Sequence, residues 1–164
     1  MRLTAYTDYS LRTLIFLAMH REQHVTIQDI ADAHGIAKNH LTKVVHQLGT
    51  LGYIATTRGR NGGLRLGMEP EDINIGDVVR HTETDFHMAS CFDDSSAGCM
   101  YSANCGLKGV LGSATAAFLA VLDAITLEQV VIKEERKQRG KAAPGKDPGV
   151  QDIAMHFKAP RKAA

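Results

Sequence analysis

Three cysteines lie close together near the middle of the chain and could hold a metal centre. Cys91, Cys99 and Cys105 follow the spacing C-x7-C-x5-C, with alanines and glycines among and beside them. Thiolates are soft donors that suit zinc or an iron–sulfur cluster. Structural zinc sites usually leave about two to four residues between paired ligands. The wider gaps favour a cluster, and a zinc site or free, redox-active cysteines remain as alternatives.

The rest of the chain favours a protein of a reducing compartment. Residues 1–4 contain one basic residue and no apolar stretch, so they do not resemble a signal peptide and we expect a cytoplasmic protein. Such a compartment disfavours disulfides, and three cysteines cannot all pair. No apolar run approaches the roughly 18–20 residues of a membrane span, so we expect no membrane contact.

Charge is distributed unevenly along a chain whose formal net charge is +1. Residues 1–70 carry eight Lys and Arg against five Asp and Glu, residues 71–105 carry one against seven, and residues 106–164 carry ten against six. The basic first segment could meet a phosphate backbone, whereas the acidic cysteine segment is not expected to touch DNA. Because a basic surface is often only solvated, charge alone assigns no function.

Apolar spacing predicts three helices in the N-terminal part of the chain. The first and third, at about residues 7–20 and 38–48, each have an apolar stripe at i, i+3, i+4 and i+7. The second is short: Thr26 and Asp29 have the spacing of a capping box at its start, and Gly35 is typical of a helix end. The two stripes consist of Leu11, Leu14, Ile15, Ala18, Leu41, Val44, Val45 and Leu48.

The periodicity then changes from helix to strand. Tyr53–Thr57 and Leu64–Leu66 are β-prone runs, and the Asn-Gly and Gly-Gly pairs of Arg58–Gly63 are strong turn signals between them. A brief helix follows at 75–82. Three helices followed by a hairpin predict a mainly α (α+β) fold, a winged helix-turn-helix with a two-stranded wing.

A long apolar helix is predicted at about residues 107–125, followed by a short helix that begins near Thr126 and ends near Ile132. The long helix is too apolar to stand alone, so we expect it to pair across a twofold axis in a homodimer. We therefore divide the chain into a DNA-binding domain (1–83), a cluster-binding loop (84–106), dimerisation helices (107–133) and a disordered tail (134–164).

The third predicted helix has the features of a helix that reads DNA. Its N-terminal half offers polar side chains off the buried stripe, of which Asn39 could read adenine and Lys43 guanine or phosphate. The predicted turn offers Arg58 and Arg60 to the minor groove or to phosphates. The alternative is a small helical domain with a solvated polar face. The full set of candidate DNA contacts is Gln28, Lys38, Asn39, His40, Thr42, Lys43, Arg58, Arg60, Asn61, Gly62 and Gly63.

These motifs resemble a family of winged-helix iron–sulfur transcriptional regulators. The similarity covers residues 1 to about 132, and its Arg-Gly-x-x-Gly-Gly wing is specific. The start of the chain and the cysteine spacing resemble the nitric-oxide-sensing branch of this family. A second branch, the repressors of iron–sulfur cluster biogenesis (the biogenesis branch), has fewer residues between the first two cysteines and a histidine ligand after the last cysteine. The residues that carry the similarity are Met1–Arg12, Asn39–Leu48, Leu51–Ile54 and Arg58–Leu66.

The resemblance implies that Cys91, Cys99 and Cys105 hold an iron–sulfur cluster, with [4Fe-4S] preferred over [2Fe-2S]. No His, Asp or Glu lies at 106–115, so the histidine of the biogenesis branch is absent. Asp8 matches the position of a carboxylate ligand in the nitric-oxide-sensing branch, although an acid at a helix start also favours the macrodipole. The other candidates for a fourth ligand are His81, His87, Asp93 and Asp94.

By this resemblance we expect a nitric-oxide-sensing repressor rather than an enzyme. As a cluster-loaded homodimer it would bind double-stranded operator DNA, and it would release the DNA when nitric oxide nitrosylates the cluster. The alternative is an iron–sulfur, redox or zinc-dependent regulator of the same fold that senses a different signal. An enzyme or electron carrier finds no support, because the sequence shows no nucleophile–base pair, nucleotide-binding loop or second cysteine set.

Overall fold

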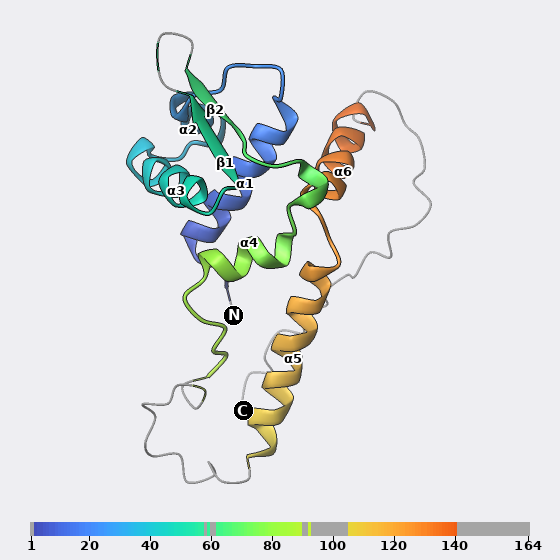
Figure 1. Cartoon of the computed structure of the whole chain (residues 1–164). Coiled ribbons are helices and arrows are strands. Elements are labelled where there is room, and N and C mark those ends of the chain that lie inside the picture. The colour runs from blue at the N-terminus through green and yellow to red at the C-terminus, as the bar shows by residue number, and fades with distance from the viewer. Residues whose placement is uncertain (1, 58, 60–61, 90–91, 93–104, 141–164) are drawn as a thin grey trace, which may run out of the picture.

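The computed structural model describes residues 2–57, 59, 62–89, 92 and 105–140. It forms a winged helix from which one long helix, α5, projects (Figure 1). The elements are α1 (Ala5–Met19), α2 (Ile27–His34), α3 (Lys38–Thr50), β1 (Ile54–Thr57), β2 (Gly63–Leu66), the 3-10 helix η1 (Pro70–Asp72), α4 (Ile75–Thr82), α5 (Gly106–Asp123) and α6 (Leu127–Gly140).

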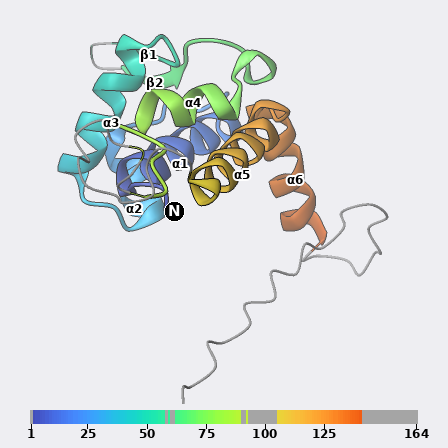
Figure 2. The ribbon, with the colours of Figure 1, turned by 90° about the horizontal axis from the view of Figure 1, so that it is seen from below.

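Helix α1 runs through the middle of the structure. Figure 2 shows it between α2 and α3 on one side and α5 and α6 on the other. Leu14 and Leu17 are buried in the common core. The helix begins at Ala5, slightly earlier than predicted, because Thr4 rather than a later residue caps it by accepting the backbone N–H of Thr7.

The predicted features of α2 and α3 are confirmed. Thr26 and Asp29 form a complete capping box, and Gly35 ends α2 in the left-handed conformation at φ 63°. The apolar stripe of α3 is buried: Leu41, Val44 and Leu48 have no exposed surface. Helix α3 therefore turns its opposite face outward.

The wing is an antiparallel pair, as predicted. Ile54 lies opposite Leu66, and Thr57 lies opposite Gly63. Leu64 also donates its backbone N–H to the carbonyl of Val25 at 2.7 Å, which joins the wing to the connection between α1 and α2. A Cβ on Gly63 would lie only 3.0 Å from that carbonyl oxygen, so a residue without a side chain suits this close approach.

The predicted helix 75–82 is α4, whereas η1 before it was not predicted. After α5, helix α6 packs on α1 and η1 through the buried Leu127 and Val131. Helix α6 continues to Gly140 instead of ending near Ile132, so the predicted start of a disordered tail at 134 falls inside a helix. The remainder of that tail lies outside the described residues.

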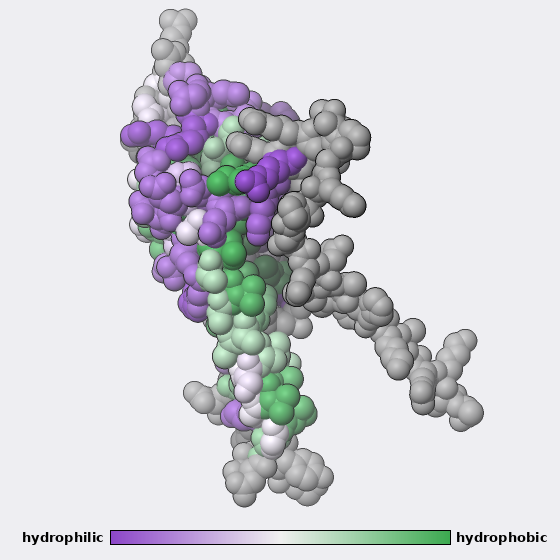
Figure 3. Space-filling view, turned by 90° about the vertical axis from the view of Figure 1, so that its right-hand side faces the viewer, coloured by the Kyte–Doolittle hydropathy of each residue, from purple (hydrophilic) through white to green (hydrophobic). Residues whose placement is uncertain are grey.

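Helix α5 has no buried residue in the single chain. Leu107, Val110 and Val121 are 64–66% exposed, and Figure 3 shows the apolar surface that runs along the helix. By length and composition α5 could also cross a membrane, with a mean hydropathy of 1.3 over 18 residues, so the expectation that no segment approaches that length is wrong. A helix that pairs with another protein meets the same criterion.

The capping box of α2 gives a first prediction. Replacing Thr26 with alanine should lower the free energy of unfolding by about 0.5–2 kcal/mol, because two first-turn contacts are lost. Thr50→Ala is the matched control, since its hydroxyl only bonds the carbonyl of His46 within its own helix. Chemical denaturation measures both.

The same box predicts a pH dependence. Hydrogen bonds from the backbone and side chain of Thr26 hold the pKa of Asp29 below its ordinary value. The resulting stability is therefore present above the unfolded pKa of the carboxyl and is lost as pH falls through the lower, folded pKa. Asp29→Asn should lose less stability between neutral and acid pH than wild type. Equal acid losses in the two proteins would contradict this role.

Candidate DNA-binding face and metal ligands

Helix α3 presents the side chains that the sequence analysis assigned to DNA. Lys38, Asn39, Thr42 and Lys43 are all exposed, opposite the buried stripe. The N-cap is Ala37, which has no side-chain acceptor for the first backbone N–H groups. Such a helix N-terminus favours an anion, so both the side chains and the backbone of this end suit a phosphate or a base edge.

Two other assigned residues have contacts within the protein. His40 is exposed, but its ring stacks on Tyr9 of α1 with 6.1 Å between ring centroids. Gln28 of α2 is exposed and donates to Asp32 at 2.8 Å, one turn further along the helix. Both lie on the surface, and their contacts orient them without burying them.

Only part of the predicted DNA-contacting turn can be placed. Arg58, Arg60 and Asn61 lie outside the described residues. Gly62 donates its N–H to the carbonyl of Gly59 at 2.9 Å, and Gly63 begins β2. The turn therefore follows directly from the end of β1, as the sequence predicted.

Contacts that the sequence analysis missed hold α3 against its neighbours. The hydroxyl of Tyr6 in α1 donates to Gln47 Oε1 at 2.9 Å and lies 3.4 Å from the carbonyl oxygen of Lys43. Gln47 Nε2 donates in turn to the carbonyl of His81 in α4 at 3.2 Å. Burial raises the pKa of Tyr6, so the phenol keeps its proton as a donor. No local pattern marks these pairs, because 41 and 34 residues separate their members.

Asp8, the candidate fourth ligand, lies in the first turn of α1 and forms an ion pair with Arg12. Both carboxylate oxygens are 3.0 Å from Arg12 Nε, and the Asp8 side chain is 44% exposed. The i,i+4 spacing of the pair is visible in the sequence. Asp8 is accessible to a partner, but in this structure its oxygens face a guanidinium.

His34 at the end of α2 lies within the electrostatic reach of this pair. Burial lowers its pKa, Arg12 lowers it further, and Asp8 opposes the change. Its ring meets Phe16 edge-on, and its Nε2 is buried with no hydrogen-bond partner among the described residues. A change in the charge of Asp8 or Arg12 would therefore alter the pKa of His34 in α2.

Of the three predicted thiolates, only Cys105 lies in the described part of the chain. It is the N-cap residue of α5 and is partly buried. Lys108, one turn later, lies over the ring of Phe92 at 5.6 Å. Cys91 and Cys99 lie outside the described residues.

The alternative fourth ligands differ in their accessibility. His81 Nδ1 is 3.0 Å from the hydroxyl of Tyr53, so one ring nitrogen is already in use. His87 is exposed and stacks on Phe92. Asp93 and Asp94 lie outside the described residues. Within residues 2–57, 59, 62–89, 92 and 105–140, no three His, Cys, Asp or Glu side chains gather as a metal site.

The arrangement of the helices separates Asp8 from Cys105 in the chain. Helix α5 packs on α4 at its C-terminal end, and its N-terminal end, where Cys105 lies, points away from α1 (Figure 1). The single chain therefore does not bring Asp8 and Cys105 together as one ligand set.

Comparisons with known proteins find similarity along most of the chain. A family model described as Rrf2, iron-dependent transcriptional regulator, matches residues 3–133. The HTH-type transcriptional regulator NsrR of Bacillus subtilis is 57% identical over 136 residues, which is 82% of this chain and 93% of that protein. Its counterpart in Bacillus licheniformis is 54% identical over 136 residues, covering 82% and 95%.

Solved structures share the fold. IscR of T. potens aligns with a TM-score of 0.67 at 26% identity, over 84% of this chain and 91% of that one. CymR, named as the global cysteine regulator of B. subtilis, aligns with a TM-score of 0.66 at 25% identity, over 81% and 98%. The winged helix-turn-helix predicted from the sequence is thereby confirmed.

The exposed face of α3 gives a second prediction. Asn39→Ala should cost about 1–3 kcal/mol of DNA binding and relax the preference at one base pair, because an amide can make two hydrogen bonds to adenine. Lys43→Ala should instead weaken binding to all sequences and reduce the salt slope by about one if Lys43 contacts a phosphate.

Binding titrations on single-base variants of a selected duplex, at several salt concentrations, measure both effects. Lys133→Ala is the control, since Lys133 is also exposed but lies on α6. If Lys133→Ala changed affinity and slope as much as Lys43→Ala, the effect would reflect net charge and not a contact made by α3.

Proposed function

The chain belongs to the Rrf2 family of transcriptional regulators, and we propose that within this family it is a nitric-oxide-sensing repressor. It binds operator DNA as a homodimer that holds an iron–sulfur cluster, and it releases the DNA in response to nitric oxide. The observation that carries the proposal is the extensive identity to regulators named NsrR. The family match also includes the cysteine segment.

The winged helix supports the DNA-binding part of the proposal. Helix α3 has a fully buried apolar stripe and an exposed polar face, as a helix in the major groove requires. The turn between β1 and β2 contributes Arg58 and Arg60 to the adjacent minor groove or to the phosphates. Two copies related by a twofold axis would present their α3 helices to major grooves about 34 Å apart.

The donor set supports an iron–sulfur cluster. Cys91, Cys99 and Cys105 supply three thiolates, and Asp8 supplies a harder oxygen ligand from α1. When bound, the cluster supplies iron that nitric oxide can ligate. We favour [4Fe-4S] over [2Fe-2S], and an anaerobic absorption spectrum with an iron and sulfide assay distinguishes these two and zinc.

Asp8 can transmit the state of the metal centre because it has two competing partners. Both of its oxygens lie 3.0 Å from Arg12 in this structure, and a carboxylate that ligates iron must give up part of this ion pair. Tyr6 lies two residues away and donates to Gln47 of α3, while Tyr9 stacks on His40. A change in the ion pair at the start of α1 therefore lies next to contacts that hold the DNA-reading helix.

The apolar surface of α5 supports a homodimer. Leu107, Val110 and Val121 are exposed in the single chain, and a second copy of α5 would cover them. Such a dimer accounts for the apolar helix without a membrane, and we propose that the protein works in the cytoplasm. In this dimer, Asp8 of one subunit would ligate the cluster held by the cysteines of the other.

The alternative signal is iron or redox state. The family model carries the description iron-dependent, which names no gas. DNA release is measured while cluster-loaded protein is titrated with nitric oxide or with an iron chelator. The comparison distinguishes nitric oxide from iron as the signal. Release of DNA only by the chelator would favour the iron-responsive alternative.

A third prediction concerns the ligands. Cys91→Ser, Cys99→Ser and Cys105→Ser should each abolish the cluster, because each removes one of three thiolates. Asp8→Ala should retain iron and sulfide but change the absorption spectrum, and should weaken DNA binding by about 5–150-fold if Asp8 couples the sites. His87→Ala is the control and should do neither. Wild-type behaviour of Asp8→Ala together with a changed spectrum in His87→Ala would make His87 the fourth ligand.

A fourth prediction concerns the dimer. Val110→Glu and Val121→Glu should leave the fold intact, because both side chains are exposed in the single chain, but should yield monomers, because a dimer would bury the charge. Met68→Glu is the control, since Met68 is an exposed apolar residue away from α5. Analytical ultracentrifugation measures the mass, and an intact dimer in both α5 variants would exclude this surface as the interface.

A further inference from the structure

Among the described residues, helix α5 contacts the winged helix mainly through α4, near the C-terminal end of α5. It has no buried residue. Asp123 is its last residue, and α6 begins four residues later at Leu127. The contacts around Asp123 therefore contribute to the direction of α5.

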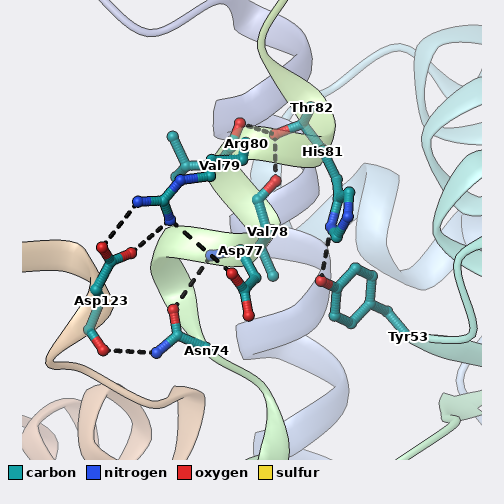
Figure 4. A network of polar contacts seen from close by, with 9 residues as sticks. All are labelled: Tyr53, Asn74, Asp77, Val78, Val79, Arg80, His81, Thr82 and Asp123. Carbon is teal, nitrogen blue, oxygen red and sulfur yellow. Dashed lines mark hydrogen bonds and ion pairs between the residues drawn. The ribbon is translucent and has the colours of Figure 1, made fainter. Parts of the chain in front are cut away.

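Two side chains of the α4 region hold Asp123 (Figure 4). Arg80 Nη1 and Nη2 donate to its two carboxylate oxygens at 2.5 and 2.7 Å, which is the bidentate geometry of an arginine–carboxylate pair. Asn74 Nδ2 donates to its backbone carbonyl at 2.7 Å. The contact with Arg80 holds the pKa of Asp123 below its ordinary value. We name Asn74, Arg80 and Asp123 the α4–α5 clamp.

The backbone around the clamp is closely packed. A Cβ on Gly76 would overlap Asp123 Oδ1, so glycine allows the carboxylate to approach the first turn of α4. Ile75 donates its N–H to the carbonyl of Ile125 at 3.0 Å, and Leu127 donates to the carbonyl of Ile73 at 2.8 Å. The end of α5 and the start of α4 thus form one joint.

The other end of α4 contacts the DNA-reading helix. The carbonyl of His81 accepts from Gln47 of α3, and the His81 ring bonds to Tyr53 just before β1. Helix α4 is only eight residues long, so it connects α5 directly to α3. A change in direction at the clamp alters the position of α3 relative to α5.

We propose that the α4–α5 clamp determines which spacing of operator half-sites the dimer binds. This inference rests on the proposed function as a dimer that reads two half-sites. An 18-residue helix is ~27 Å long, so a tilt of ~10° at the clamp moves its far end by ~5 Å. One base pair advances DNA by about 3.4 Å, so such a tilt shifts the match between α3 helices and major grooves by more than one base pair.

The test uses the full chain, purified anaerobically, and a duplex selected from a random pool by the wild-type protein. The duplex is rebuilt with one or two base pairs added or removed at its centre. Wild type should prefer one spacing clearly. Arg80→Gln and Asp123→Asn should reduce this preference by about tenfold, chiefly by weakening binding at the preferred spacing. Arg80→Lys should retain part of the spacing preference, because lysine keeps the positive charge but cannot make the bidentate pair.

Asp77→Asn is the matched control. It removes a charge from the same helix, 3.9 Å from Arg80, without a contact to α5. It should keep the wild-type spacing preference. If Arg80→Gln lost affinity equally at every spacing, with a lower melting temperature, the clamp would be merely structural and the proposal would be overturned. An unchanged preference in both clamp variants would overturn it as well.

Failure of the proposed function gives a different result. Wild type would then bind no duplex with two half-sites. The clamp is in that case tested by the hydrogen-exchange rates of the Ile75 and Leu127 amides, whose hydrogen bonds hold the joint together. Faster exchange in Arg80→Gln than in Asp77→Asn would support control of the joint by the clamp. Equal exchange in the two variants would overturn it.

Discussion

The packing of α1 against the rest of the winged helix is the interaction on which the other features depend. Its buried face contains Thr7, Ser10 and Thr13 beside Leu14 and Leu17. The hydroxyls of Ser10 and Thr13 donate to carbonyl oxygens one turn earlier in α1, so small polar residues can be buried without unpaired donors. Side chains of this size let neighbouring helices approach α1 closely.

Helix α1 also carries side chains that concern both the proposed metal centre and the DNA-reading helix. Asp8 and Arg12 are on its surface, while Tyr6 and Tyr9 contact α3. A ligand that binds Asp8 therefore acts on an element that is rigidly packed and already bonded to the DNA-reading helix. A rigid connection of this kind transmits a displacement, whereas a flexible loop would absorb it.

Helix α5 poses the opposite constraint, because nothing in the single chain buries its apolar side chains. Exposed apolar surface of this extent is unfavourable in water and marks an interaction surface. The acidic segment 71–105 lies before it in the sequence, and the basic segment 1–70 contains the DNA-reading elements. Dimerisation through α5 would cover the apolar surface and leave the basic α3 faces free.

Local patterns in the sequence predicted most of the secondary structure. The stripe at 38–48, the capping box at Thr26, the glycine at the end of α2 and the helix at 75–82 were all predicted, because each depends on neighbours within one or two turns. The stripe predicted on α1 was only partly right: Leu11 and Ile15 are partly buried, whereas the buried face includes Thr7, Ser10, Thr13 and Leu17. The sequence also identified the three cysteines and, through the resemblance, the family. Helix α6 was predicted too short, since the polar composition after Ile132 favours disorder, whereas the structure continues the helix to Gly140.

The contacts that join these elements could be seen only in the folded chain. Tyr6 with Gln47 and Arg80 with Asp123 are 41 and 43 residues apart, and no periodicity relates them. The tertiary structure also placed Asp8 at the start of α1 and Cys105 at the start of α5, two helix ends that the single chain does not bring together. The physical reason is that a repeat of 3.6 residues specifies which side of a helix is buried, while only packing of the complete core specifies which helix lies against it and at what angle.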